Sequence, residues 1–236
     1  MKISLNIIAT NKYTFFLDEI CESIDRLFFT ESEILVIIHT NVEISSDLEK
    51  YKRIKIHVNK IEHEQWPFTT LKRFHYFLSC SDVIKETDYS FYVDADSLFI
   101  GELKESILPV SGMIGTIHPC LFKGEGTPER DPSSRAYIPY GSGNRYFCGG
   151  FFGGKSEDFI MMSLMNKSNI EDDLLRNIIA IWHDESHINK FFFVNPPAVV
   201  LDHPFAVAES MTQIHNTSGV LFLDKNVRGG HDFFRE

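Results

Sequence analysis

The chain has 236 residues, of which 43% are hydrophobic and 24% are charged, a balance typical of a folded globular protein and not of a disordered one. Its 33 aspartates and glutamates outnumber its 23 lysines and arginines, so the net charge is −10. Because neutralising nucleic-acid phosphates needs a basic face, this charge argues against a nucleic-acid-binding protein. The length favours one domain with a sizeable core.

The cysteines and the apolar runs restrict the class of protein further. No C-x-x-C pair occurs among the four cysteines, so zinc-ribbon and redox motifs have no support, and we expect reduced, mostly buried thiols. The sequence contains no apolar run of about 18 residues, and its N-terminus lacks a small-residue cleavage site. We therefore expect a soluble, cytoplasmic protein without a membrane span.

The first hundred residues alternate between strand-like and helix-like patterns. Apolar or alternating runs predict strands over residues 3–9, 34–39, 53–58 and 89–93, and helical spacing predicts helices over 13–29 and from 68 to about 80. This alternation implies parallel pairing in a Rossmann-like α/β layer, where ligands bind beyond the carboxyl ends of the strands. Residues 10–13 and 94–96 both stand at such ends.

The pattern after residue 100 is less regular. Residues 122–143 are rich in glycine, proline and serine, which predicts a long surface connection with a functional role. Four of the six residues 149–154 are glycines. We expect helices over 157–165 and 171–181, a third helix beginning near Asp184, and a flexible tail at the C-terminus.

The tripeptide Asp94-Ala95-Asp96 directly follows the apolar strand predicted at 89–93. Residues two apart on an extended backbone project to the same side, so both carboxylates can converge on one hard cation such as Mn²⁺ or Mg²⁺. A cation held there would neutralise the diphosphate of a nucleotide and favour its departure. The alternative is a strand-end turn with two solvated acids.

The segment at 182–187, Trp-His-Asp-Glu-Ser-His, is the second candidate for chemistry. If Asp184 opens a helix, its side chain can cap free amides and Glu185 is held, ionised, near the helix N-terminus. A carboxylate in that position suits a nucleophile or a stabiliser of a cationic transition state. Two alternatives stay open, a zinc site built on His183 and His187 and a capped helix with a buried Trp182 and no chemistry.

Three cations allow two interpretations each. Arg73 lies in a helix that Pro67 is suited to begin, and Lys225 and Arg228 lie in the predicted tail. Each of the three is either a solvated surface charge or a phosphate ligand. The planar guanidinium group of arginine suits a diphosphate, and a tail that carries cations suits a lid that closes over phosphate.

Six segments of the sequence, in order and at similar spacing, resemble glycosyltransferase family 6, which contains the histo-blood-group A and B transferases and the α-1,3-galactosyltransferase. These segments are residues 66–73, 94–96, 115–119, 136–139, 149–154 and 182–187, and the resemblance extends from Ile8 to about Leu201. It implies a single GT-A domain over residues 1–236, with a mainly UDP-binding half at 1–100, a mainly acceptor-binding and catalytic half at 101–220, and a tail at 221–236.

The reaction that the resemblance implies is transfer of galactose or N-acetylgalactosamine from UDP to a galactoside, in α-1,3 linkage and with retained configuration. The implied donor residues are Ala9, Thr10 and Tyr13 for uracil and ribose, Arg73, Asp94, Ala95 and Asp96 for the diphosphate and metal, Cys148, Gly149, Gly150 and Asp184 for the sugar, and Lys225 and Arg228 in the tail. The implied acceptor residues are His118, Thr127, Trp182 and Glu185, and Glu185 also matches the catalytic carboxylate.

Several expectations depend on where this chain departs from its relatives. Many similar microbial members have N-x-N in place of D-x-D and work without metal, so the two acids here predict dependence on Mn²⁺, with Asp96 as the direct ligand. The small Gly150 leaves room for an acetamido group and favours UDP-N-acetylgalactosamine. One methyl group of pocket volume is worth only about 1–3 kcal/mol, so this preference is compatible with use of both donors.

The resemblance leaves the mechanism, the acceptor and two other functions open. Glu185 either attacks the sugar or only stabilises a cationic intermediate. The sequence diverges after Leu201, which leaves the acceptor beyond a galactose terminus undetermined. The alternatives are a non-catalytic carbohydrate-binding protein of the same fold and a UDP-sugar hydrolase.

Overall fold

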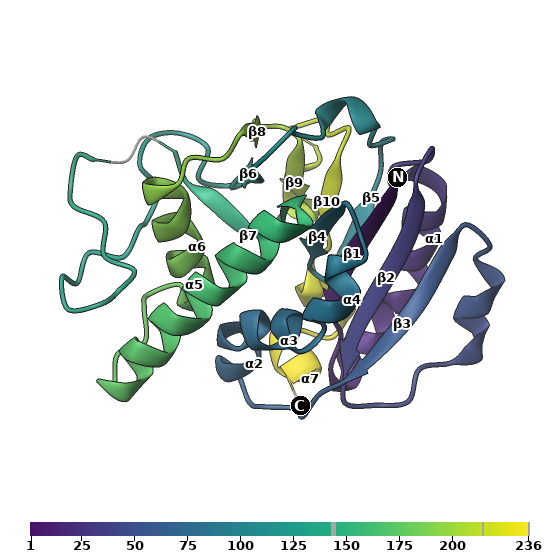
Figure 1. The fold of residues 1–236 in the computed structure, drawn as a ribbon, viewed down its shortest axis with the longest axis horizontal. Coiled ribbons are helices and arrows are strands. Elements are labelled where there is room, and N and C mark those ends of the chain that lie inside the picture. The colour runs from purple at the N-terminus through teal and green to yellow at the C-terminus, as the bar shows by residue number, and fades with distance from the viewer. Residues whose placement is uncertain (143–144, 214, 236) are drawn as a thin grey trace.

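The computed structural model describes residues 1–142, 145–213 and 215–235, so Gly143 of the predicted connection lies outside the described residues. A seven-stranded sheet has the order β3-β2-β1-β4-β7-β6-β8, and a three-stranded sheet has the order β5-β10-β9 (Figure 1). The strands are β1 Lys2–Ile8, β2 Glu33–Thr40, β3 Ile54–Lys60, β4 Tyr89–Val93, β5 Ser97–Phe99, β6 Met113–Ile117, β7 Phe147–Lys155, β8 Val199–Leu201, β9 Ala206–Ala208 and β10 Val220–Phe222.

Helices cover both faces of the large sheet, as Figure 1 shows. The α-helices are α1 Leu17–Leu27, α2 Phe68–Leu71, α3 Arg73–Ser79, α4 Ser81–Lys85, α5 Ser156–Leu175, α6 His183–Val194 and α7 His231–Arg235. Short 3₁₀ helices occupy Asn11–Phe16, Ser46–Lys50, Glu105–Ile107, Glu209–Met211 and Lys225–Arg228. No helix among the described residues is both long and apolar enough to cross a membrane.

The predicted Rossmann-like layer is confirmed in the first half of the chain. Strands β3, β2, β1 and β4 are neighbours and pair in parallel, as the alternation of strands and helices implied. Because parallel strands end at one edge of the sheet, Thr10 after β1 and Asp94 after β4 come to the same edge. This edge is where the sequence placed the candidate ligands.

The glycine run at 149–154 is part of a central strand. It lies in β7, which pairs antiparallel with both β4 and β6. A side chain at Gly153 would collide with the ring of Phe91 on β4, so the glycine allows that large aromatic to pack against the strand. The sequence pattern missed this strand because four glycines in six positions indicate turns more often than buried sheet.

Large apolar side chains fill the core on both faces. On one face, Ile24 of α1 packs in a cluster with Leu5 and Phe91 of the sheet. On the other face, Phe77 of α3 and Phe159 of α5 belong to a second cluster. The excess of phenylalanine in the composition is therefore explained by two layers of aromatic packing, one on each side of the sheet.

Several predicted helices have different bounds in the structure. The one expected over 13–29 begins as a 3₁₀ turn and becomes α1 only at Leu17, and the one expected over 68–80 is divided into α2 and α3. The helix expected over 157–165 and the first part of the one expected over 171–181 form one continuous helix, α5, because no glycine or proline interrupts the chain between them. α5 ends at Leu175, so the expectation of helix over 176–181 is wrong.

The C-terminal segment differs from the tail expected at 221–236. Through Arg235 it continues from the last residues of β10 into a 3₁₀ helix and then α7. Phe234 is buried against Phe16 and Tyr13, which lie in the turn after β1. The C-terminal helix is therefore packed beside the edge of the sheet that carries the candidate ligands.

Candidate active site

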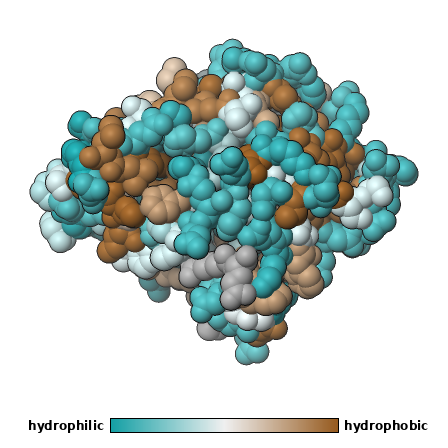
Figure 2. Space-filling model, turned by 90° about the horizontal axis from the view of Figure 1, so that it is seen from below, coloured by the Kyte–Doolittle hydropathy of each residue, from teal (hydrophilic) through white to brown (hydrophobic). Residues whose placement is uncertain are grey.

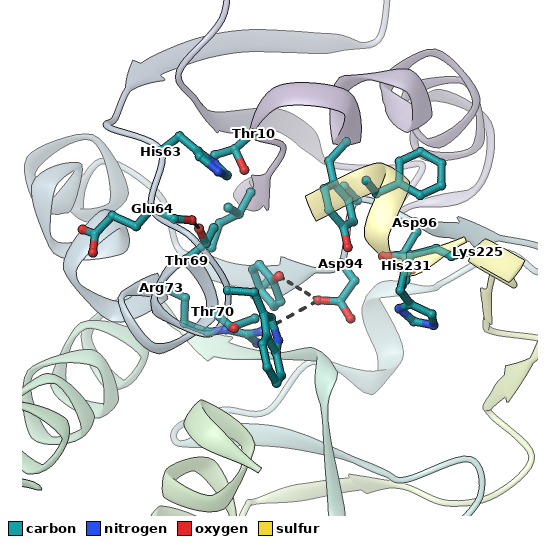
Figure 3. Close-up of a pocket in the computed structure, with 16 residues that line it drawn as sticks. Thr10, His63, Glu64, Thr69, Thr70, Arg73, Asp94, Asp96, Lys225 and His231 are labelled. Carbon is teal, nitrogen blue, oxygen red and sulfur yellow. Dashed lines mark hydrogen bonds and ion pairs between the residues drawn. The ribbon is translucent and has the colours of Figure 1, made fainter. Parts of the chain in front are cut away.

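A cavity of about 260 Å³ lies at the edge where β1 and β4 end. Seven of the residues expected to bind the donor line it: Thr10, Tyr13, Arg73, Asp94, Ala95, Asp96 and Lys225. Figure 3 shows Arg73 and Asp94 joined across one part of the cavity, while Asp96, Lys225 and His231 lie together. Ala9 is fully buried behind this edge and does not line the cavity.

The two carboxylates of the D-x-D segment have different partners. Asp94 accepts a hydrogen bond from the hydroxyl of Tyr92 at 2.7 Å, and Asp96 accepts one from the ammonium group of Lys225. Burial raises the pKa of Asp94, the nearby Arg73 opposes that rise, and the negative charge of Asp96 adds to it. The surroundings of the Asp94 carboxylate therefore favour a neighbouring positive charge.

The D-x-D carboxylates are two candidate ligands for a divalent cation. Both line the same cavity and both supply the oxygen ligands that hard cations prefer. The ammonium group of Lys225 already contacts Asp96, which shows that positive charge is accommodated at this position. The alternative of two solvated acids is wrong for Asp96, which is only 7% exposed, whereas the side chain of Asp94 is 35% exposed.

Arg73 connects three parts of the site. Its Nε lies 2.9 Å from Oδ2 of Asp184, its Nη1 donates to the carbonyl oxygen of Gly149 at 2.5 Å, and its Nη2 lies 3.9 Å from Oδ1 of Asp94. The guanidinium also lies over the ring of Tyr92. Arg73 is 4% exposed, so its interpretation as a solvated surface charge is wrong. A planar, five-donor group is what allows one side chain to hold all these partners.

The helix that carries the catalytic candidates begins near Asp184, as expected, but it is not capped as expected. α6 starts at His183, which has a φ of 51°, and Trp182 precedes it without a capping side-chain bond. Asp184 therefore does not cap the helix, and its carboxylate pairs with Arg73 instead. Burial raises the pKa of Asp184 to about 6, and the charge of Arg73 limits the rise.

Glu185 is held by hydrogen bonds to both of its carboxylate oxygens. The backbone N–H of Gly149 donates to Oε2 at 2.8 Å, and the hydroxyl of Tyr146 donates to Oε1 at 2.8 Å. Burial raises the pKa of Glu185 to about 7, and these two hydrogen bonds limit the rise. A carboxylate fixed in this way is oriented for chemistry but costly to ionise.

Tyr146, which the sequence did not single out, connects Glu185 with two predicted acceptor residues. The side chain of Thr127 hydrogen-bonds Tyr146, and the ring of His118 lies edge-on to the Tyr146 ring at 5.7 Å. His118 accepts backbone N–H bonds on Nδ1, which leaves Nε2 to carry the proton. Only the position of Tyr146, two residues before the predicted sugar-contacting Cys148, could have pointed to it.

The zinc alternative does not fit the geometry. His187 lies 3.6 Å from Asp173, whereas the ring of His183 packs against Trp66. No cluster of three or more His, Cys, Asp or Glu side chains able to hold a metal occurs within 1–142, 145–213 and 215–235. Trp182 is 46% exposed, so the alternative of a buried tryptophan is also wrong.

The remaining predicted site residues lie in different surroundings. Cys148, like Cys21 and Cys80, is a buried free thiol, and only Cys120 of the four is exposed, as the expectation of mostly buried, reduced cysteines required. Arg228 does not line the cavity, because its side chain donates to Glu209.

On the face seen in Figure 2, hydrophobic residues form patches separated by hydrophilic ones.

Comparisons with known proteins bear on the family of this chain. The model of the family described as "Glycosyltransferase family 6" matches residues 1–222. The O-antigen biosynthesis glycosyltransferase WbnI of Escherichia coli is 29% identical over 204 residues, which are 85% of this chain and 86% of that protein. The histo-blood group ABO system transferase 1 of Rattus norvegicus is 29% identical over 208 residues.

The chain spans 59% of that rat transferase and 60% of the globoside alpha-1,3-N-acetylgalactosaminyltransferase 1 of Gallus gallus, which is 28% identical over 210 residues. The family model nevertheless covers nearly the whole chain, including the D-x-D segment, the glycine strand and the helix that carries Glu185. The chain belongs to glycosyltransferase family 6.

Proposed function

We propose that this protein is a retaining α-1,3-glycosyltransferase that moves N-acetylgalactosamine, or galactose, from its UDP donor to a galactose-terminated glycan. The observation that carries the proposal is the position of Arg73, which pairs with Asp94 on one side and with Asp184 on the other. A single buried cation thus joins the nucleotide end of the cavity to the helix that presents Glu185.

The residues of the chain divide the reaction between them. Thr10 and Tyr13 hold the uridine in this proposal, which is supported by their position in the lining of the cavity beyond β1. Arg73 and Lys225 supply positive charge for the diphosphate as it leaves with the bonding electrons. Glu185, whose two carboxylate oxygens are both held by hydrogen bonds, stabilises or attacks the developing cation at the anomeric carbon.

Asp94 and Asp96 are the residues that would hold Mn²⁺ or Mg²⁺. A bound cation supplies charge neutralisation to the leaving diphosphate, the role of a Lewis acid. The oxygen-only donor set supports a hard cation over zinc. Lys225 contacts Asp96, so it shares in neutralising this pair of acids.

The proposal is tested by incubating the protein with UDP-N-acetylgalactosamine and with UDP-galactose, in Mn²⁺, against a panel of galactose-terminated and fucosylated acceptors. We expect UDP release together with a disaccharide or larger product whose new linkage is α-1,3 by NMR. Release of free sugar in the absence of product would show a hydrolase. No UDP release with any acceptor, combined with glycan binding, would show a binding protein.

A further inference from the structure

The space beside Gly150 is occupied by a side chain from the C-terminal part of the chain. A Cβ atom placed on Gly150 would lie 2.5 Å from Cε1 and 2.7 Å from Cζ of Phe222. Both distances are too short for real carbon atoms, so the ring of Phe222 already fills the volume that the missing side chain leaves. A glycine at this position therefore does not by itself leave open room for an acetamido group.

Gly150 lies between the two ends of the candidate reaction centre. Its carbonyl oxygen accepts the backbone N–H of Asp94 at 2.9 Å, and the preceding Gly149 donates to Glu185. A Cβ atom on Gly150 would also lie 2.9 Å from Oδ2 of Asp94. A sugar that joins a diphosphate at Asp94 to a reaction centre beside Glu185 would extend along this part of β7, next to the ring of Phe222.

Phe222 is fixed by the small sheet and faces the D-x-D segment. It is the last residue of β10, where it pairs with Ser97 of β5 and with Ala208 of β9. Its ring lines a second cavity together with Asp94, Asp96 and Lys225. The position of the Phe222 ring is therefore determined by the C-terminal part of the chain, and the ring forms part of the cavity wall next to the D-x-D segment.

We propose that Phe222 is a donor-specificity residue that acts together with Gly150, because its ring narrows the space in which the two donors differ. This inference rests on the proposed function. Galactose and N-acetylgalactosamine differ only at C2, where a hydroxyl replaces an acetamido group, so a ring at this wall penalises the larger substituent. The preference for N-acetylgalactosamine is then smaller than Gly150 alone implies.

The test uses Phe222→Leu. Leucine keeps most of the apolar packing but lacks the outer ring atoms Cε1 and Cζ, which are the atoms that crowd Gly150. The ratio of kcat/KM for UDP-N-acetylgalactosamine to kcat/KM for UDP-galactose is measured for both proteins, and we expect Phe222→Leu to raise it about tenfold. An unchanged or lowered ratio would overturn the inference.

Phe205→Leu is the matched control. Phe205 is also partly buried against the same core cluster, and it packs against Phe151 and not at Gly150. The donor ratio of Phe205→Leu should equal that of the unmodified protein. A similar rise in both variants would mean that general loosening of the core, and not the wall at Gly150, changes the ratio, and it would refute the role of Phe222.

A double-mutant cycle with Gly150→Ala adds a readout of the contact itself. Alone, Gly150→Ala places a methyl group against the Phe222 ring and should weaken use of both donors. Combined with Phe222→Leu, the methyl group gains room, so the double variant should recover at least part of the loss. Additive losses would show that the two positions do not act together.

Calorimetric binding distinguishes failure of this inference from failure of the proposed function. If the unmodified protein transfers neither sugar, the proposed transferase activity fails. The ratio of the dissociation constants for UDP-N-acetylgalactosamine and UDP-galactose still reports on the wall at Gly150. Phe222→Leu should shift that ratio toward UDP-N-acetylgalactosamine, and an unchanged ratio would overturn the inference.

Discussion

The hydroxyl of Tyr146 donates to Oε1 of Glu185 at 2.8 Å, while the backbone of Gly149 satisfies Oε2 at the same distance. The two donors hold the carboxylate in one orientation inside a buried site. They also lower the pKa of Glu185 against the effect of burial. Tyr146 is therefore a positioning residue that keeps Glu185 both oriented and ionisable.

Tyr146→Phe removes one of these donors without changing the ring. A hydrogen bond to a charged group is worth about 1.5–3 kcal/mol, so we expect kcat to fall about tenfold or more. Because the lost bond lowers the pKa of Glu185, the acid limb of the pH–rate profile should move to higher pH. Tyr140→Phe, at an exposed position shortly before Tyr146 in the chain, is the control. A lower kcat with an unmoved acid limb would contradict the role given to Tyr146.

The pH dependence of transfer should report on Glu185 in the unmodified protein. Its pKa is raised to about 7, so the carboxylate becomes protonated as the pH falls through that value. Only the ionised form can attack or stabilise a cation, and transfer should therefore decline below about pH 7. The measurement is kcat/KM for the acceptor at saturating donor. A profile that is flat down to pH 5 would exclude Glu185 as the ionised group.

Glu185→Gln should remove transfer and stabilise the fold. Because the native pKa lies above the ordinary value of 4.5, the native state binds the proton more tightly, and the contribution of Glu185 to stability falls as the pH rises from about 4.5 to about 7. The neutral amide avoids this loss, so at pH 8 the free energy of unfolding should increase by on the order of 1–3 kcal/mol.

Urea unfolding at pH 8 and pH 5 measures this difference. The gain from Glu185→Gln should be largest at pH 8 and small at pH 5, where the native Glu185 is already protonated. Glu22→Gln, at an exposed position on α1, should change little at either pH. Equal stability of Glu185→Gln and the unmodified protein at pH 8 would show that ionised Glu185 is not destabilising.

Arg73→Ala should damage both stability and transfer. It leaves Asp184 as a buried charge without its partner, which typically costs about 3–5 kcal/mol. Arg73→Lys keeps the charge but not the planar fork that reaches Gly149 and Asp184 together, so it should retain more stability than activity. Lys72→Ala removes the neighbouring, partly exposed cation and should cost at most about 1 kcal/mol. Thermal unfolding and UDP-release assays measure both effects.

We predict that transfer depends on a divalent cation, because the D-x-D segment supplies two carboxylates to the cavity. We expect chelation with EDTA to abolish transfer and Mn²⁺ to restore it. Asp96→Asn should weaken Mn²⁺ binding, measured by electron paramagnetic resonance of the free ion, independently of turnover. Full activity after exhaustive chelation would mean that Lys225, which contacts Asp96, and Arg73 are sufficient to neutralise the diphosphate.

Local patterns in the sequence determined the first half of the fold and the position of the metal candidates. Alternating strands and helices require parallel pairing, and parallel strands deliver Thr10 and Asp94 to one edge. Hydrophobic periodicity is a property of neighbouring residues, so it can be recognised in the sequence without knowledge of the fold. The same reasoning misplaced the ends of α1 and α5 because element boundaries depend on packing.

Only the tertiary structure decided which residues act together. The antiparallel insertion of β7 beside β4 brings Gly149 to Arg73 and Glu185, and the small sheet brings Phe222 to Gly150. These partners are far apart in the chain, and no local propensity or spacing encodes their approach. The sequence by itself identified the acids that are candidates for chemistry, whereas the packing of distant segments determined which partners hold those acids and how deeply they are buried.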